Sequence, residues 1–229
     1  MFTRLGYEYR GHESWALTTS PPPSAVVLAA AGLGVLLGAI LAATVTSRTL
    51  ARPTSPRLII AVGSATTGLT FTVLATRFDG VDLLAFCWLA AAGTVLSTID
   101  VIERRLPSVI VLSSYVTLVA LLAVSALADN DFTDLLRALC ASALIFGAYL
   151  VIALVSRRGL GAGDVKLGGL LGLAMGWQSW QTVFGGTLLG WTAAAVTTLI
   201  IRCARKGPPD SIPMGPFLLF GSLLDIVLH

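Results

Sequence analysis

The residues best able to support chemistry in this 229-residue chain are acids within or beside long apolar segments. Seven of the 12 acids fall in segments expected to face outward, and the other five are Asp100, Glu103, Asp164, Asp210 and Asp225. An ionisable side chain in or at the edge of a membrane helix is costly, and by default it marks a functional site. Glu103 and Asp210 lie among arginines and are most simply interfacial ion pairs, and Asp225 is expected to reach water near the chain end. Asp100 and Asp164 therefore remain as the candidate catalytic residues.

Each of these two aspartates also has an ordinary structural interpretation. Asp100 is followed by Arg104 and Arg105, so it is equally well an interfacial charge paired with one of them. Asp164 follows Gly161-Ala162-Gly163, and by itself it is more simply a helix N-cap than a catalytic acid. The two glycines allow positive φ or a close approach to another helix.

Taken together, the two aspartates predict more than either does alone. The charge distribution described below places both at cytoplasmic ends of apolar segments, so they share one depth although 64 positions separate them. Two neighbouring carboxylates cannot both ionise cheaply, so one pKa rises and the pair holds a single proton near neutrality. The ionised member can then activate a water while the protonated member hydrogen-bonds a scissile carbonyl. This is the chemistry of an aspartyl protease.

Other catalytic and cofactor chemistries find little support in the sequence. The two histidines, His12 and His229, lie near the termini, and Cys87, Cys140 and Cys203 form no CxxC pair. We therefore expect no metal site, no cofactor and no disulfide framework. The 15 basic residues are scattered at segment ends, so no nucleic-acid partner is expected.

The elements that must position these acids are membrane helices. Apolar residues make up 55% of the chain and charged residues only 12%, about half the usual share of a soluble domain. This composition excludes a cytosolic enzyme and a disordered chain. A span needs about 20 apolar residues, and the sequence divides into about eight segments, near 24–46, 57–76, 81–99, 108–128, 133–155, 164–177, 181–201 and 212–229. We predict an all-α polytopic membrane protein whose short sixth segment is tilted, half-inserted or continuous with the preceding loop.

The basic residues alternate between the two sides of the predicted membrane. One set of loops holds 11 of them, and the opposite set, with the N-terminal tail, holds four. By the positive-inside rule the first set is cytoplasmic and both termini face outward. We expect an extracytoplasmic tail at 1–23 and a single transmembrane domain at 24–229.

Small and aromatic residues suggest how the helices pack. Gly168, Gly172 and Gly176 give the sixth segment a face for close packing, and the glycines of the seventh segment are expected to do the same. A glycine-lined face also leaves room for a substrate helix. Two of the tryptophans near 177–191 are predicted to form an interfacial aromatic belt.

Three ordered motifs resemble those of the type IV prepilin peptidases. Gly161-Ala162-Gly163-Asp164-Val165-Lys166-Leu167 is similar to that family's Gly-x-Gly-Asp motif, and the stretch from Asp100 to Pro107 is similar to its first aspartate motif. A third match lies at the start of the last segment and reads Ile212-Pro213-Met214-Gly215-Pro216-Phe217-Leu218. Pro107 stands in a similar way at the start of the fourth segment. The matches cover most of the chain from about residue 85 onward, and in combination they favour the catalytic interpretation of both aspartates.

The resemblance implies a membrane aspartyl endopeptidase of the inner (cytoplasmic) membrane. Such enzymes cut the basic leader from prepilin-like substrates at the cytoplasmic face, using here Asp100 and Asp164. Gly161, Gly163, Pro107 and Lys166 would support the site, and Lys166 would either tune the dyad, contact lipid phosphates or serve as a positive-inside anchor. Many members carry two CxxC pairs in the loop after the first helix, associated with N-methylation. Here that loop, about 47–56, has no cysteine, so peptidase activity without methyltransferase activity is expected.

Two other classes of function stay open from the sequence. A transporter or channel could use the aspartates for proton or cation coupling, although such acids are expected near the middle of the membrane. A catalytically silent component of a pilus or secretion apparatus would keep the same fold. The presence of both aspartates and both glycines favours an active peptidase.

Overall fold

The computed structural model describes residues 24–48, 56–104, 106–155, 160–204 and 213–228, and these form helices joined by short connections. The helices are α1 Ser24–Arg48, α2 Pro56–Leu74, α3 Gly80–Glu103, α4 Ser108–Asp129, α5 Thr133–Val155, α6 Ala162–Gln178, α7 Trp180–Ala204 and α8 Gly215–Leu228. The all-α prediction is confirmed. The largest boundary difference is at the end of α3, which continues four residues beyond the predicted segment and so includes Asp100 in its last turns.

Six of the described helices are long and apolar enough to span a membrane, namely α1, α2, α3, α4, α5 and α7. The other two, α6 and α8, have 17 and 14 residues. The protein is thus a multi-pass membrane protein with two shorter helices, of which α8 is apolar.

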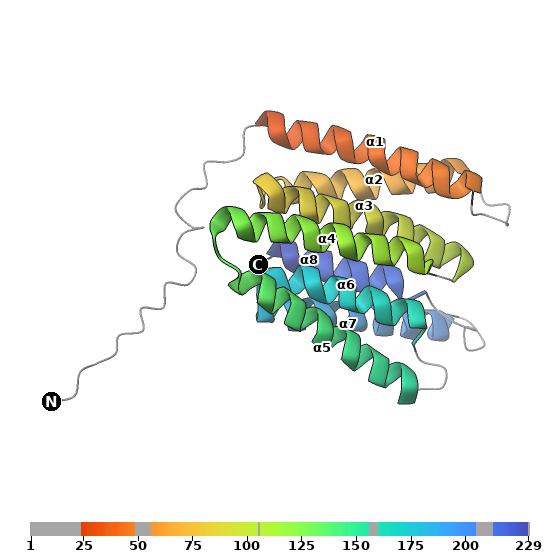
Figure 1. Cartoon of the computed structure of the whole chain (residues 1–229). Coiled ribbons are helices and arrows are strands. Elements are labelled where there is room, and N and C mark those ends of the chain that lie inside the picture. The colour runs from red at the N-terminus through yellow and green to blue at the C-terminus, as the bar shows by residue number, and fades with distance from the viewer. Residues whose placement is uncertain (1–23, 49–55, 105, 156–159, 205–212, 229) are drawn as a thin grey trace.

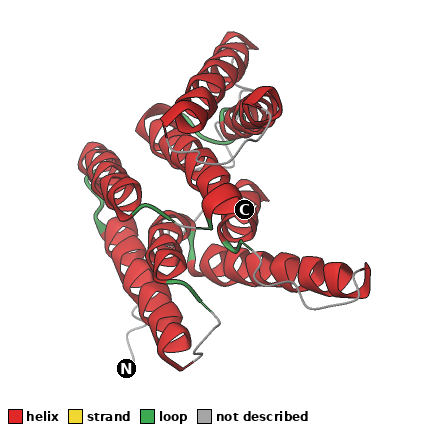
Figure 2. Ribbon diagram, turned by 90° about the vertical axis from the view of Figure 1, so that its right-hand side faces the viewer, coloured by secondary structure: helices red, strands yellow, loops and turns green. Residues whose placement is uncertain are grey.

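Successive helices run antiparallel, so every second connection lies at the same end of the bundle (Figure 1). Helices α3, α5 and α7 end where α4, α6 and α8 begin, and Figure 2 looks onto that end. This arrangement brings the end of α3 and the start of α6 to one side of the molecule. It agrees with the alternation of basic residues, since Arg57, Arg104, Lys166 and Arg202 all belong to this end.

Helix α6 forms the centre of the bundle because, from Leu167 to Trp177, it is apolar on all sides. Twelve of its 17 residues are buried, and it packs against α4, α5, α7 and α8. A side chain at Gly172 would lie 2.9 Å from the carbonyl oxygen of Ala141, and one at Gly176 would lie 2.9 Å from the Cα of Ala138. The predicted glycine face is therefore correct and is filled by α5, which leaves no room there for a substrate helix.

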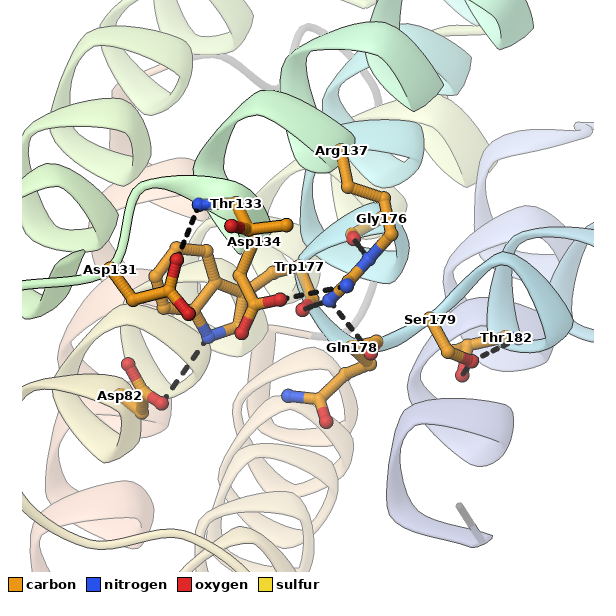
Figure 3. A network of polar contacts seen from close by, with 10 residues as sticks. All are labelled: Asp82, Asp131, Thr133, Asp134, Arg137, Gly176, Trp177, Gln178, Ser179 and Thr182. Atoms are coloured by element: carbon orange, nitrogen blue, oxygen red, sulfur yellow. Dashed lines mark hydrogen bonds and ion pairs between the residues drawn. The ribbon is translucent and has the colours of Figure 1, made fainter. Parts of the chain in front are cut away.

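The end of the bundle opposite Asp100 is held by a polar network. Figure 3 shows its members from α3, α5 and α6, and Ser125 adds α4. The indole Nε1 of Trp177 donates to Asp82 Oδ2 at 3.2 Å, and the hydroxyl of Ser125 donates to Asp82 Oδ1 at 2.7 Å. Arg137 donates to carbonyls at the end of α6 and forms an ion pair with Asp134. The expected aromatic belt is wrong for Trp177, which is 6% exposed, because its indole N–H finds a carboxylate inside the bundle.

Asp82→Ala is expected to lower the melting temperature of the purified protein in detergent. The change leaves the Ser125 hydroxyl and the Trp177 N–H without their acceptor, and a buried polar group without a partner costs about 1–3 kcal/mol. Asp79→Ala is the matched control, since this exposed acid at the start of α3 makes no side-chain cap hydrogen bond. Equal melting temperatures for the two variants would contradict the stabilising role of the network.

Asp225 also differs from its predicted position. It is 3% exposed rather than reaching water, and it lies against α7, where a side chain at Gly185 would meet both carboxylate oxygens at 2.8 Å. Glycines allow this approach, because α8 packs closely on α7 along Gly186 and Gly190. Asp225 thus belongs to the α7–α8 contact near the C-terminal end of α8.

Candidate active site

Asp100 lies in the last turns of α3 and is 6% exposed. The helix ends just after it because Arg104 adopts a left-handed conformation, with φ of 55°, and its backbone N–H bonds to the carbonyl of Asp100. The carboxylate Oδ2 of Asp100 accepts a hydrogen bond from the backbone N–H of Gly215 at 2.9 Å. Asp100 is therefore held by the first residue of α8. Arg105, one of its two expected arginine partners, lies outside the described residues.

Gly215 is required at this contact because α8 begins directly against the carboxylate. A Cβ on this residue would lie 2.8 Å from Asp100 Oδ2 and 3.5 Å from Asp100 Cβ. The N-terminus of a helix also favours a negative charge through its unpaired N–H groups and its dipole. From the sequence, Gly215 is predicted only to lie at the start of the last helix; its contact with Asp100 is not predicted, although its position inside a recognisable motif is a signal.

Asp164 occupies the first turn of α6 and is partly buried. Its Oδ2 accepts a hydrogen bond from the backbone N–H of Gly161 at 3.1 Å. The N-cap interpretation is thus wrong in detail: Gly161 is the N-cap, and Asp164 reaches back to it from the third helical position. This hydrogen bond fixes the carboxylate at the N-terminal end of α6 through Oδ2 alone, and Oδ1 takes no part in it.

The surroundings of Asp164 favour its protonated form. Burial raises the pKa of Asp164 to about 6, the Gly161 N–H opposes this change, and the negative charge of Asp100 raises the pKa further. Asp164 lies outside the six spanning helices, at the end of the bundle where the basic residues gather. The structure thus brings the two acids within electrostatic range of each other, although they come from different helices.

Gly163 allows α6 to begin close to the α3–α4 connection. A side chain there would lie 2.7 Å from the Cβ of Leu106. A Cβ on Gly161 would lie 3.2 Å from Asp164 Oδ2, and the φ of Gly161 is an ordinary −75°. Of the two explanations offered for these glycines, close approach applies at Gly163, and positive φ applies at neither residue.

The remaining supporting residues connect α4 to the first turn of α6. Pro107 is the N-cap of α4 rather than its first helical residue, and its carbonyl accepts the N–H of Ile110. Lys166 is exposed, and its Nζ donates to the hydroxyl of Ser108 at 2.8 Å. The Tyr115 hydroxyl donates to the Lys166 carbonyl at 3.0 Å. These bonds hold Asp164 in place from the α4 side.

The other acids do not join the pair. Glu103 is exposed at the end of α3, Asp225 lies on the α7–α8 contact, and Asp210 falls outside the described residues. Among the described residues, no group of three or more histidines, cysteines or acids could hold a metal ion. The described part of the site thus consists of two carboxylates, each held by a backbone N–H.

Comparison with known proteins gives one informative match. A sequence model of the type IV leader peptidase family matches residues 83–204, which is 122 of the 229 residues. The matched region begins before Asp100 and includes Asp164. No curated protein and no solved structure gives a significant match.

Proposed function

The chain belongs to the type IV leader peptidase family, and on that premise we propose that it is an aspartyl endopeptidase whose dyad is Asp100 and Asp164. Its substrates are prepilin-like proteins, and the bond it cuts joins the basic leader to the apolar helix. The observation that carries the proposal is the pair of partly or fully buried carboxylates at one end of the bundle, held by Gly215 and Gly161. A peptidase of this kind needs neither a metal nor a nucleophilic side chain.

The proposed reaction uses one proton shared by the pair. The ionised carboxylate takes a proton from water, and the resulting hydroxide adds to the scissile carbonyl while the protonated carboxyl donates a hydrogen bond to the carbonyl oxygen. The tetrahedral intermediate collapses when the leaving amine receives a proton from the pair. The products are the free leader acid and the mature amine terminus, and the dyad returns to its singly protonated state.

The position of the site supports cleavage at a membrane face. Asp100 and Asp164 lie at the end of α3 and the start of α6, where the basic residues also gather. The positive-inside rule supports a cytoplasmic position for this end, and in our proposal the enzyme belongs to the inner (cytoplasmic) membrane with both termini outside. Residues 24–229 act in this proposal as one transmembrane peptidase domain, and membrane lipids are its other partners.

Co-expression with a candidate prepilin-like protein tests the proposal. Cleavage is detected as a gel shift, and mass spectrometry of the product locates the cut. We expect a new amine terminus without added methyl groups, because the loop after α1 has no cysteine. An uncut substrate that inserts correctly beside the folded enzyme would contradict the proposed activity for that substrate, and ion-dependent flux in proteoliposomes would favour a transporter.

The cleavage rate is expected to fall as the pH rises above about 6, the pKa of Asp164. With Asp100 ionised, loss of the Asp164 proton leaves two negative charges and no proton to donate to the scissile carbonyl, so the singly protonated dyad exists only below this range. The measurement is kcat/KM as a function of pH for the enzyme reconstituted in lipid, because this ratio reports the ionisation of the free enzyme, with folding checked at each pH.

A variant of the N-cap residue provides the matched test of this pH dependence. Gly161→Pro removes the N–H that lowers the pKa of Asp164, while the φ of −75° at this position suits proline. The fall in cleavage rate should therefore begin at a higher pH in this variant than in the wild type. A fall at the same pH in both enzymes would show that another group controls the rate.

A further inference from the structure

An apolar groove runs along the membrane-facing side of the bundle between α2 and α8. Its volume is 690 Å³, and its walls come from residues 58–73 of α2, 90–102 of α3 and 216–227 of α8. Helices α2 and α8 both pack on α3 and leave this face of α3 between them. No charged residue lines the groove.

One end of the groove is lined by the immediate sequence neighbours of Asp100 and Gly215. Val101 and Ile102 line it and directly follow Asp100 on α3. Pro216 lines it from α8 and directly follows Gly215, whose N–H bonds to the Asp100 carboxylate. A segment lying in the groove would therefore have its end beside Asp100.

The groove is as long as much of a membrane span. The α2 wall of 16 residues corresponds to about 22 Å at 1.5 Å per residue, and the α3 wall to about 18 Å. Several apolar side chains at its edges, such as Leu58, Leu69 and Phe220, are 60–68% exposed. The groove is thus open along its side to a partner within the membrane.

The floor of the groove is built for a helix. Ala90, Thr94 and Thr98 recur every four residues on α3, and Gly93 and Ser97 form a second row beside them. The hydroxyls of Thr94 and Thr98 donate to carbonyls four residues earlier on α3. Ala90 and Gly93 are themselves buried, Gly93 against Leu219 of α8, and the Thr94 hydroxyl also bonds that of Thr67 on α2. The part of the floor left half-buried is therefore Thr94, Ser97 and Thr98, where short side chains allow a second helix to approach closely and gain dispersion contacts. A flexible acyl chain has no corresponding need for small residues at this spacing.

We propose that this groove docks the apolar transmembrane helix of the substrate and delivers the leader junction to Asp100. The proposal rests on the proposed peptidase function and adds the surface that selects the substrate. The substrate helix lies along α3 between α2 and α8, and the chain beyond its end passes the dyad at the membrane face. Specificity then comes from the fit of an uncharged helix with a small or apolar face, separately from the chemistry at the carboxylates.

Disulfide crosslinking tests the location directly. The full-length enzyme carries Asp164→Asn to prevent cleavage and has its three native cysteines replaced, and single cysteines are introduced at Ser97 or, as the matched control, at Ser113 on the exposed side of α4. Each is co-reconstituted in proteoliposomes with a prepilin-like protein bearing one cysteine in its apolar helix. We expect oxidation to crosslink the substrate to Ser97→Cys and not to Ser113→Cys. Equal crosslinking at both positions, or an enzyme dimer joined through position 97, would overturn the proposal.

Kinetics with bulky substitutions provide the second readout. Ser97→Phe, or Thr66→Phe on the α2 wall, should raise KM for the membrane-inserted substrate about tenfold while kcat stays within about twofold. Ser113→Phe adds the same bulk outside the groove and should leave both constants near those of the wild type. An unchanged KM in both groove variants would indicate that the groove holds a lipid chain or nothing.

The two proposals fail in different ways. If Asp100→Asn and Asp164→Asn still cleave the substrate, the dyad is wrong, whatever the crosslinking shows. The other case is that both variants are inactive, the substrate does not crosslink at position 97, and Ser97→Phe leaves KM unchanged. The peptidase proposal then stands and the docking groove is wrong.

Discussion

Asp100→Asn and Asp164→Asn are each expected to lower leader cleavage by at least about 1,000-fold, the upper range for loss of general acid–base catalysis. Asn keeps the size of the side chain and cannot hold or exchange the proton that the proposed reaction needs. It can also still accept the hydrogen bonds that Gly215 and Gly161 donate, so both variants should fold and insert. The measurement is the gel shift of a co-expressed prepilin-like substrate, with enzyme quantified in the membrane fraction.

Glu103→Gln is the matched control for these two variants. Glu103 is an exposed acid three residues after Asp100 on the same helix, so its neutralisation changes local charge without touching the pair. Its cleavage should stay within about threefold of the wild type. Near-normal cleavage by either Asn variant, or a loss in Glu103→Gln as large as theirs, would refute the assignment of the dyad.

Gly215→Ala is expected to lower cleavage about 100-fold, the usual effect of moving a catalytic group by about 1 Å. The new Cβ would lie 2.8 Å from Asp100 Oδ2, closer than carbon and oxygen pack, so either the carboxylate or the start of α8 must move. Both movements lengthen the hydrogen bond that holds Asp100. Because the change adds one methyl group, a large loss of activity would show that the position of the carboxylate matters.

Gly147→Ala separates this local effect from the general effect of adding a methyl group to a helix. A Cβ at Gly147 would meet nothing within 4 Å, and alanine favours the helical conformation more than glycine does. This control should keep full activity and equal or higher thermal stability. Full activity in Gly215→Ala would contradict the proposed support of Asp100 by α8.

Much of the fold could be predicted because the membrane restricts what an apolar segment can do. Without water, backbone polar groups must bond within the segment, so a run of about 20 apolar residues becomes a helix. The predicted segments therefore match the eight described helices, and the glycine spacing of α6 correctly indicated a close helix contact. The family was also predictable, since its motifs are short, contiguous stretches of sequence; the match at 83–204 includes the two aspartate motifs, and the third motif, at 212–218, lies beyond it.

The predictions that were wrong concern partners distant in sequence. Trp177 was expected at a lipid interface and Asp225 in water, but both are buried against other helices. Hydropathy describes the average surroundings of a segment and does not say which side of a helix meets which neighbour. For the same reason, the hydrogen bond between Asp100 and Gly215, 115 positions away, could not be predicted from the sequence.

The sequence by itself determined the helices, their alternating directions and the end of the bundle at which Asp100 and Asp164 lie, because hydropathy and charge act locally along the chain. Only the tertiary structure decided what holds each carboxylate and what lies beside it. Gly215 at Asp100, Leu106 at Gly163 and the groove between α2 and α8 all depend on how closely two helices approach. That distance follows from the packing of side chains on both helices at once, and no single segment contains it.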